Sequence, residues 1–287
     1  MKTVTTIGQL REHIGRARAA GRRVGLVPTM GALHEGHLQL CDAARRHADE
    51  VVLSIFVNPL QFGPAEDFDR YPRDLNRDAG LVSSRGVALL FAPETDEVFP
   101  NGSSPVRVHA PDLGNVLCGR FRPGHFEGVL TIVAKLFNMV RPDCAVFGQK
   151  DLQQASLIRR MARDLDFGID VIVGRIVRDP DGIALSSRNA YLSADQRHSA
   201  LALHRALSAA QAAFAAGADD PAVILGAARA TLEAEPGVAT QYVEVVDPES
   251  LATPDRVGRG HAVAVAAYVG STRLIDNHIL EQAGSVP

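Results

Sequence analysis

Val24-Gly-Leu-Val-Pro-Thr-Met-Gly-Ala-Leu-His-Glu-Gly-His-Leu-Gln-Leu40 is the stretch that decides the predicted fold. It opens with apolar, β-prone residues, and we expect this strand to end at Pro28, which has no N–H with which to continue a central strand. Gly31 and Gly36 permit backbone conformations that a Cβ would block. From Leu38 onward, apolar residues recur with helical spacing. A strand, a turn and a helix start in this order are typical of a nucleotide site, because the first turn of a helix attracts phosphate.

Two histidines of this turn, His34 and His37, would lie beside the phosphate. A polyphosphate favours the protonated imidazole and accepts hydrogen bonds from its N–H groups. Two other interpretations stay open: the pair could ligate a metal, although no third ligand is evident nearby, or it could be structural. A P-loop is disfavoured, because His37 and Leu38 stand where that motif needs Lys and Ser or Thr.

Composition limits the classes of function. The 287 residues are 46% hydrophobic and 22% charged, as in an ordinary globular protein of about two domains. A net charge of −3 disfavours a surface for nucleic acid. No apolar run is long enough for a membrane span. Three scattered cysteines and no recognisable secretory leader predict reduced thiols in a cytoplasmic protein.

The first two thirds of the chain alternate between strand and helix patterns. The continuous apolar run from Val51 to Val57 is typical of a strand covered on both faces. Such strands, alternating with helices, predict an α/β fold with a Rossmann-like, doubly wound parallel sheet. Helices are expected at 7–20, 37–48, 74–85, 126–140 and from the Gly148–Gln154 turn to about 165, and further strands at 87–91, 106–109, 144–147 and 169–173.

The pattern changes near residue 178, where Asp179-Pro-Asp-Gly182 is rich in turn formers. The expected elements beyond it are helices at 194–216 and 221–235 and strands at 241–246, 261–269 and 273–276. We therefore predict two domains: residues 1–177, which bind the nucleotide, and a smaller α+β domain, residues 178–287. That the smaller C-terminal domain is a lid, which closes over the site about a hinge near residues 175–182, is a hypothesis.

Three more clusters carry chemistry on predicted loops. Asn58–Gln61 offers neutral amides for a polar substrate. Lys150 offers a point charge for phosphate, and Asp151 a carboxylate for ribose or hydrated Mg²⁺. The hydroxyl and guanidinium groups of Ser186–Arg188 could wrap a polyphosphate. Each cluster could instead be an ordinary surface feature, and Gln154 alone would be a surface amide.

Four quoted stretches together resemble the pantoate–beta-alanine ligase family, which belongs to the nucleotidyl-transferase group. They are Pro28-Thr-Met-Gly-Ala-Leu-His-Glu-Gly-His-Leu38, Phe56-Val-Asn-Pro-Leu-Gln-Phe62, Phe147-Gly-Gln-Lys-Asp-Leu-Gln-Gln154 and Leu185-Ser-Ser-Arg-Asn189. The resemblance extends from about residue 3 to 280. It implies that His34-Glu-Gly-His37 is the His-x-x-His turn of this group.

The resemblance implies an ATP-dependent reaction in two steps. Pantoate attacks the α-phosphorus of ATP and expels pyrophosphate, and the amine of β-alanine then attacks the acyl carbon of pantoyl adenylate. The products are AMP and pantothenate, a coenzyme A precursor. The family further implies Mg²⁺ and a homodimer, and the charge and the apolar pattern of the chain predict neither nucleic acid nor membrane as a partner.

The resemblance also assigns roles to individual residues. The catalytic group is His34, His37, Lys150 and Arg188, with His37 able to protonate the departing group. The ATP contacts are Met30, Gly31, Ala32, Leu33, His34, Glu35, Gly36, His37, Gly148, Gln149, Lys150, Asp151, Val177, Leu185, Ser186, Ser187 and Arg188. The substrate-binding residues are Asn58, Gln61 and Gln154; Gln61 and Gln154 would hold pantoate, and Gln61 would also meet β-alanine.

Two other classes of function remain open at this point. A nucleotidyltransferase would share the histidine turn and release a nucleotide-containing product, so release of AMP would exclude it. A non-catalytic nucleotide sensor would bind ATP without turnover.

Overall fold

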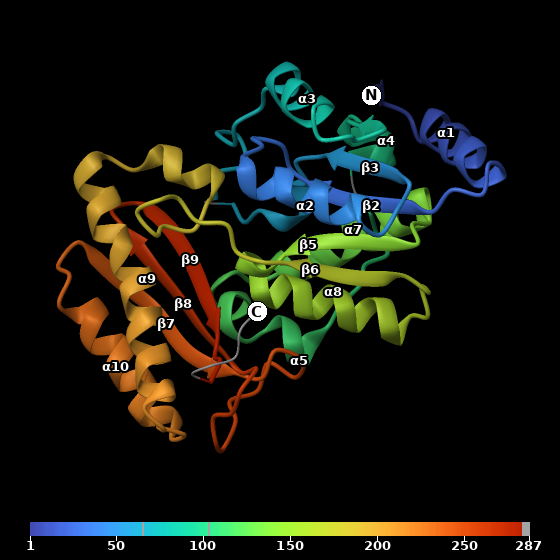
Figure 1. Ribbon diagram of the computed structural model, residues 1–287. Coiled ribbons are helices and arrows are strands. Elements are labelled where there is room, and N and C mark those ends of the chain that lie inside the picture. Colours follow the sequence, from blue (N-terminus) through green and yellow to red (C-terminus); the bar gives the residue numbers. More distant parts are fainter. Residues whose placement is uncertain (65, 103, 283–287) are drawn as a thin grey trace. The chain divides into compact units, whose positions relative to one another are not determined.

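Figure 1 shows the computed structural model, which describes residues 1–64, 66–102 and 104–282. The chain divides into two compact units, and each is described by itself. Unit 1 consists of residues 1–148 and 157–175, and unit 2 of residues 149–156 and 176–287. The domain boundary between residues 177 and 178 stays a prediction.

Unit 1 contains a six-stranded parallel sheet with flanking helices, so the predicted doubly wound α/β fold is confirmed. The sheet order is β1-β4-β3-β2-β5-β6, and β2 lies between β3 and β5, where the strand order reverses. Open α/β sheets bind ligands beyond the carboxyl ends of the strands at such a point. The strands are β1 (Lys2–Val4), β2 (Val24–Thr29), β3 (Glu50–Ile55), β4 (Leu89–Phe91), β5 (Cys144–Gly148) and β6 (Asp170–Gly174).

The strand β2 continues through Pro28, so the expected end at this residue is wrong. Pro28 pairs with Ser54 and the next residue, Thr29, with Ile55 of β3. On the other side, β5 pairs only with Gly25 and Leu26. At Pro28 the strand therefore has a single neighbour, and the missing N–H costs no bond toward β5.

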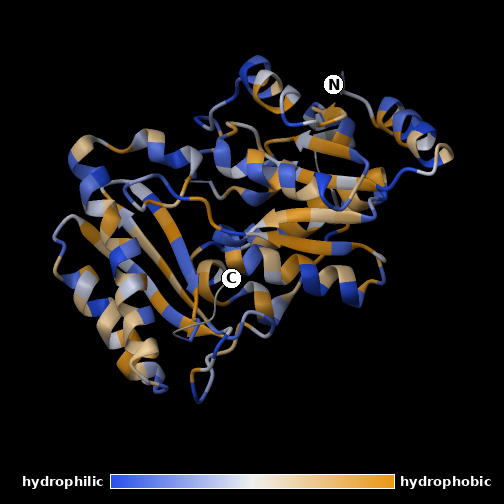
Figure 2. Ribbon diagram, viewed as in Figure 1, coloured by the Kyte–Doolittle hydropathy of each residue, from blue (hydrophilic) through white to orange (hydrophobic). Residues whose placement is uncertain are grey.

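Helices cover the parallel sheet because its strands are apolar on both faces, as their colouring in Figure 2 illustrates. On one face, α2 and α3 pack over Val27, Leu53 and Val146 in a continuous core. Helices α1 and α7 contact each other and β2. The helices of unit 1 are α1 (Ile7–Ala19), α2 (Glu35–Arg45), α3 (Leu75–Ser83), α4 (Thr95–Val98), α5 (Pro111–Gly114), α6 (Leu117–Phe121) and α7 (His125–Val140), with the short helices η1 (Pro59–Gln61) and η2 (Pro100–Gly102).

Two edge features differ from the sequence prediction. Residues 106–109 form no strand, and Val106 is 80% exposed, so its β-prone side chain is not used for packing. The short strand β1 was not expected; it pairs with β4 over three residues at the edge of the sheet. A pattern of three residues is too short to show the periodicity on which the prediction depends.

Unit 2 contains a three-stranded antiparallel sheet packed against two helices. Its order is β7-β8-β9, and the long helices α9 and α10 pack on each other and on the sheet. Its elements are β7 (Val238–Val246), β8 (Ala262–Val269), β9 (Thr272–Ile279), α9 (Ala194–Ala215), α10 (Pro221–Glu233), η3 (Gln149–Asp151) and η4 (Ser187–Tyr191). Helix α8 (Leu152–Asp164) begins in the residues of unit 2 and continues in those of unit 1. The predicted smaller α+β unit is confirmed as a fold.

Among the described residues, no helix has the length and apolar character that a membrane crossing requires.

Candidate active site

The turn after β2 is fixed by its own backbone and by one buried carboxylate. Gly31 has φ +83° and Ala32 φ +51°, both in the left-handed region. The Leu33 N–H donates to Asp78 Oδ1 at 2.9 Å, and Asp78 is only 1% exposed. This bond joins the turn to α3. The role of Asp78 was not predicted, because an aspartate within an amphipathic helix looks like a surface charge.

His34 and His37 lie together at the N-terminus of α2, as predicted. His34 is the residue before the helix, and its backbone N–H donates to His37 Nδ1 at 3.4 Å. The two rings have centroids 4.1 Å apart and are tilted by 37°. Both imidazoles are half-buried, and the helix dipole presents its positive end at the same place. The arrangement suits an anion with several acceptor oxygens.

The loop after β3 lies directly against this turn. Gln61 Nε2 lies 2.9 Å from the sulfur of Met30. Asn58 Nδ2 donates to Gln61 Oε1 at 3.0 Å and to the Gly128 carbonyl at 3.1 Å. Asn58 is 1% exposed and Gln61 9%. Within unit 1 the structure therefore brings together the predicted nucleotide turn and the predicted substrate loop, with Asn58 orienting the Gln61 amide.

Two further residues, His125 and Arg122, contact the Gln61 carbonyl oxygen, Arg122 through Nη2 at 3.5 Å, and neither was predicted. His125 Nδ1 lies 2.8 Å from the Gln61 carbonyl oxygen. Arg122 forms two bonds of 2.7 and 2.6 Å to the Glu66 carboxylate. Burial acts to raise the pKa of Glu66, but the Arg122 hydrogen bonds and charge outweigh it and hold the pKa below its usual value. The glycine at 124, which precedes α7, is the one sequence signal that could have drawn attention to this helix start.

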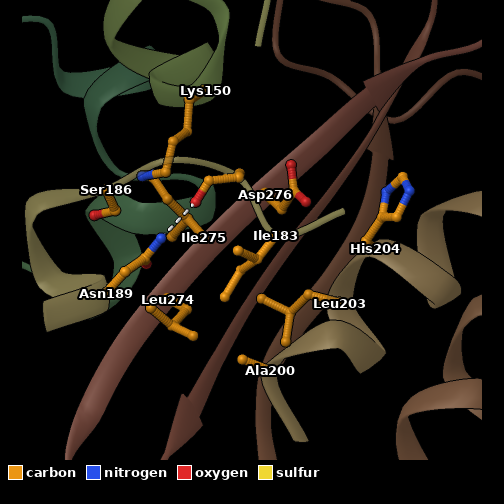
Figure 3. A pocket seen from close by; sticks show the side chains of 11 residues that line it. Lys150, Ile183, Ser186, Asn189, Ala200, Leu203, His204, Leu274, Ile275 and Asp276 are labelled. Atoms are coloured by element: carbon orange, nitrogen blue, oxygen red, sulfur yellow. Dashed lines mark hydrogen bonds between the residues drawn. The ribbon is translucent and has the colours of Figure 1, made fainter. Parts of the chain in front are cut away.

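In unit 2, Lys150 and Ser186 line the same pocket, which has about 280 Å³ of empty space including its open mouth. Lys150 extends from η3 with its ammonium group toward Ser186 (Figure 3). Asn189 also lines the pocket and donates from Nδ2 to the Ala184 carbonyl at 3.0 Å. Its Oδ1 is buried and has no hydrogen-bond partner among the described residues. The ammonium of Lys150 and the hydroxyl of Ser186 give this pocket two groups that can bind a phosphate oxygen.

The segment that leads to Ser186 is held by hydrogen bonds between its own two ends, near residues 177 and 185. The Leu185 N–H donates to the Val177 carbonyl at 2.9 Å, so these two predicted ATP contacts lie side by side. Ser186 precedes η4, and its Oγ accepts from the Arg188 N–H at 3.3 Å. The cap fixes the backbone from which Ser187 and Arg188 project.

The far wall of the pocket carries a titratable group, His204. Its Nδ1 is buried and lacks a hydrogen-bond partner in the described part of the chain. Burial and the nearby Arg178 charge lower the pKa of His204, while Asp276 acts in the opposite direction. The ring is therefore neutral at pH 7. Figure 3 shows it directed away from Lys150 and Ser186.

Some predicted site residues lie neither in the cluster around Gln61 nor in the pocket lined by Lys150 and Ser186. Gln154 is half-buried on the first turn of α8, and it is not among the residues that line the pocket. Asp151 is exposed. In the ranges that the structure describes, no three His, Cys, Asp or Glu side chains gather as metal ligands.

Comparison with known proteins identifies the family. The model of the family described as pantoate-beta-alanine ligase matches residues 2–279. The chain belongs to this family. Pantothenate synthetase 1 of Bradyrhizobium diazoefficiens is 51% identical over 286 residues, which are 99% of this chain and 100% of that protein. The predicted resemblance is thus confirmed.

Solved structures of pantoate–beta-alanine ligases match the whole fold. Pantothenate synthetase from Thermus thermophilus superimposes with a TM-score of 0.92 at 46% identity, over 97% of this chain and 99% of that one. The ligase from Francisella tularensis, described as complexed with beta-gamma ATP and beta-alanine, has a TM-score of 0.81 at 31% identity, over 97% of each chain. As a member of this family, the chain is a ligase that forms pantothenate.

Proposed function

We propose that the chain forms pantothenate from pantoate and β-alanine at the expense of ATP, through pantoyl adenylate. The observation that carries this proposal is the contact between the histidine turn and the Gln61 amide, 2.9 Å from Met30, in a chain whose family relative was crystallised with an ATP compound and β-alanine. A nucleotide turn beside a polar substrate loop is what joining two small substrates requires.

In the first step, a pantoate carboxylate oxygen bonds to the α-phosphorus of ATP while the bond to pyrophosphate breaks. Negative charge grows on the phosphate oxygens, so donors already in place lower the barrier most. His34 and His37 lie together at the N-terminus of α2, which supports this role. His37 is the group we assign to protonating the leaving pyrophosphate.

Lys150, Ser186 and Arg188 are assigned to the phosphates as well. The pocket that Lys150 and Ser186 share supports this assignment, since it offers an ammonium and a hydroxyl within one small volume. The bond from the Arg188 backbone N–H to Ser186 Oγ supports a fixed backbone at the base of both side chains. The remaining ATP contacts are those that the family resemblance implies.

In the second step, the amine of β-alanine attacks the acyl carbon of the adenylate, and AMP leaves with the electrons of the broken C–O bond. Asn58, Gln61 and Gln154 are assigned to the organic substrates. The buried bond from Asn58 to Gln61 supports this, because it fixes an amide without adding charge. Excluding water at this stage protects the anhydride from hydrolysis.

Mg²⁺ enters as part of the substrate, bound to the phosphates of ATP. The chain offers no cluster of three His, Cys, Asp or Glu among its described residues. The described residues are therefore suited to a Mg²⁺ ion whose ligands are mainly phosphate oxygens and water molecules. The exposed Asp151 carboxylate could accept a hydrogen bond from such a water.

A homodimer and a cytoplasmic location complete the proposal. The dimer rests on the family resemblance, and sedimentation equilibrium of the purified protein tests it. The location is supported by the cysteines: Cys41, Cys118 and Cys144 are buried, and burial raises the pKa of Cys41 to about 12. Such thiols suit a reducing compartment.

The activity is tested by supplying MgATP, pantoate and β-alanine and following AMP and pantothenate by mass spectrometry. Both products are expected together, and only when both organic substrates are present. Omitting β-alanine should leave pantoyl adenylate on the enzyme. ADP, or a nucleotide-linked final product, would contradict the proposal.

A further inference from the structure

A single buried side chain holds the turn that carries Lys150. Asn277 lies on β9 of unit 2 and is 2% exposed. Its Nδ2 donates to the carbonyls of Gln149 at 2.9 Å and Lys150 at 3.0 Å. Its Oδ1 accepts from Gln149 Nε2 at 3.2 Å. One amide thus uses both its donor and its acceptor on a segment that lies more than 120 residues earlier in the chain.

The preceding residue on β9 holds the other phosphate-binding segment of unit 2. The Asp276 side chain is 4% exposed and pairs with Arg178 through bonds of 2.6 and 3.0 Å. Arg178 also donates to the Gly182 carbonyl at 3.1 Å, at the base of the loop that leads to Ser186. Successive side chains of a strand point to opposite faces, so neighbouring residues of β9 can each hold a different segment.

The chemistry of the asparagine is specific at this position. Two carbonyl oxygens converge on Nδ2, so a donor is required, and the Gln149 amide requires an acceptor beside it. Aspartate has the same shape but would put a negative oxygen against both carbonyls. Alanine would remove the donor and the acceptor together, and the turn would lose its bonds to β9 from this side chain.

We propose that Asn277 is a positioning residue for Lys150: it fixes the turn so that the ammonium group meets the phosphates of ATP. The inference rests on the proposed role of Lys150 in that reaction. Lysine is a point charge on a flexible stem, so the backbone at its base decides how much freedom it must lose on binding. A misplacement of about 1 Å can cost about 100-fold in rate.

The test compares Asn277→Asp and Asn277→Ala with wild type. The KM for ATP should rise on the order of 10- to 100-fold in Asn277→Asp, with a smaller rise in Asn277→Ala, while the KM values for pantoate and β-alanine stay constant. Val265→Ala is the matched control: it removes buried volume from β8 in the same sheet, without a bond to the turn. It should lower stability and leave the KM for ATP unchanged.

A double-mutant cycle separates positioning from general damage. If Asn277 acts through Lys150, adding Asn277→Ala to Lys150→Ala should cause little further loss of kcat/KM. A full further loss would overturn the inference, as would a folded Asn277→Asp protein with a wild-type KM for ATP. If Asn277→Asp does not fold, Asn277→Ser, which keeps one donor, should show an intermediate KM, and a wild-type value would overturn the inference.

Binding of MgATP alone, measured by calorimetry, keeps the inference distinct from the proposed function. If wild type makes no AMP and pantothenate, the proposed function fails. If wild type does make them but Asn277→Asp binds MgATP as tightly, only the positioning role fails.

Discussion

The turn after β2 and the turn after β5 both lead from a parallel strand into a helix, but the contacts that hold them come from different distances along the chain. Gly31 and Ala32 fix the first turn by their own left-handed backbone, and Asp78 adds a bond to Leu33. The second turn, η3, receives bonds from Asn277. A turn that is fixed by its own residues can be recognised in the sequence as a motif. For a turn held by a remote residue, the local sequence reveals only the charged side chain and not the contact that positions it.

The largest expected effect tests whether both turns serve one transition state. His37→Ala and Lys150→Ala should each lower kcat for AMP release by about 100-fold or more, since each removes a donor to the developing phosphate charge. His47→Ala, at an exposed site, is the control. Near-wild-type turnover in either folded variant would show that the turn carrying that residue does not stabilise the transition state.

The second effect concerns the substrate loop, which adjoins the turn of unit 1. Gln61→Ala should raise the KM for pantoate about 10- to 100-fold, the value of a hydrogen bond to a charged group. The KM for ATP should change far less. The exposed Gln39, on α2, provides the control substitution Gln39→Ala. An equal rise in both KM values would mean that Gln61 supports the nucleotide turn rather than pantoate.

The third effect tests whether the first turn is fixed locally. Gly31→Ala should destabilise the protein by about 1–3 kcal/mol, because the left-handed conformation is strained for a residue with a Cβ. The added Cβ would also lie 3.1 Å from both Asp78 Oδ2 and Ile55 Cγ2. Gly15→Ala is the matched control, with open space around its Cβ in helix α1. Urea denaturation should show Gly15→Ala to be stabilising by about 0.5–1 kcal/mol; a similar gain for Gly31→Ala would contradict the strain.

The smallest effect belongs to unit 2 and depends on pH. The pKa of His204 is lowered in the folded protein by burial and by Arg178. The unfolded chain therefore binds the proton more readily, so stability is present above the usual histidine pKa of about 6.5 and is lost as the pH falls below it. In thermal denaturation, the stability of His204→Gln should therefore fall less than that of wild type between about pH 7 and pH 5. The stability of His47→Gln should fall as much as that of wild type, and identical pH curves for wild type and His204→Gln would exclude this source.

Where neighbouring residues encode the structure, the sequence predicted it. The strands β3, β4, β5 and β6 were expected within one or two residues of their observed ends. A continuous apolar run marks β3, β4 and β5 as strands buried on both faces, whereas β6 is only half-buried. The histidine turn was predicted for the same reason: glycines, an ended strand and a helix start stand within 17 residues. The fold class follows from this alternation alone.

What the sequence could not predict depends on neighbours brought close by folding. Pro28 stays in β2 because β5 pairs only with the start of that strand, a register that no local pattern records. Asp78 and Asn277 look like surface residues until α3 and β9 bring them to the two turns. The site residues were assigned through the family resemblance rather than through geometry, and they stay predictions.

Unit 2 is made of two separate segments of the chain, so its parts become available at different times during synthesis. Its first segment, residues 149–156, precedes the rest of the unit by about 20 residues of unit 1. The amide that holds this segment lies on β9, more than 120 residues later in the chain. A ribosome therefore adds more than 120 further residues before the Lys150 turn acquires its anchor, so a nascent or truncated chain that lacks β9 should fold unit 1 while the Lys150 turn of unit 2 lacks the bonds from Asn277.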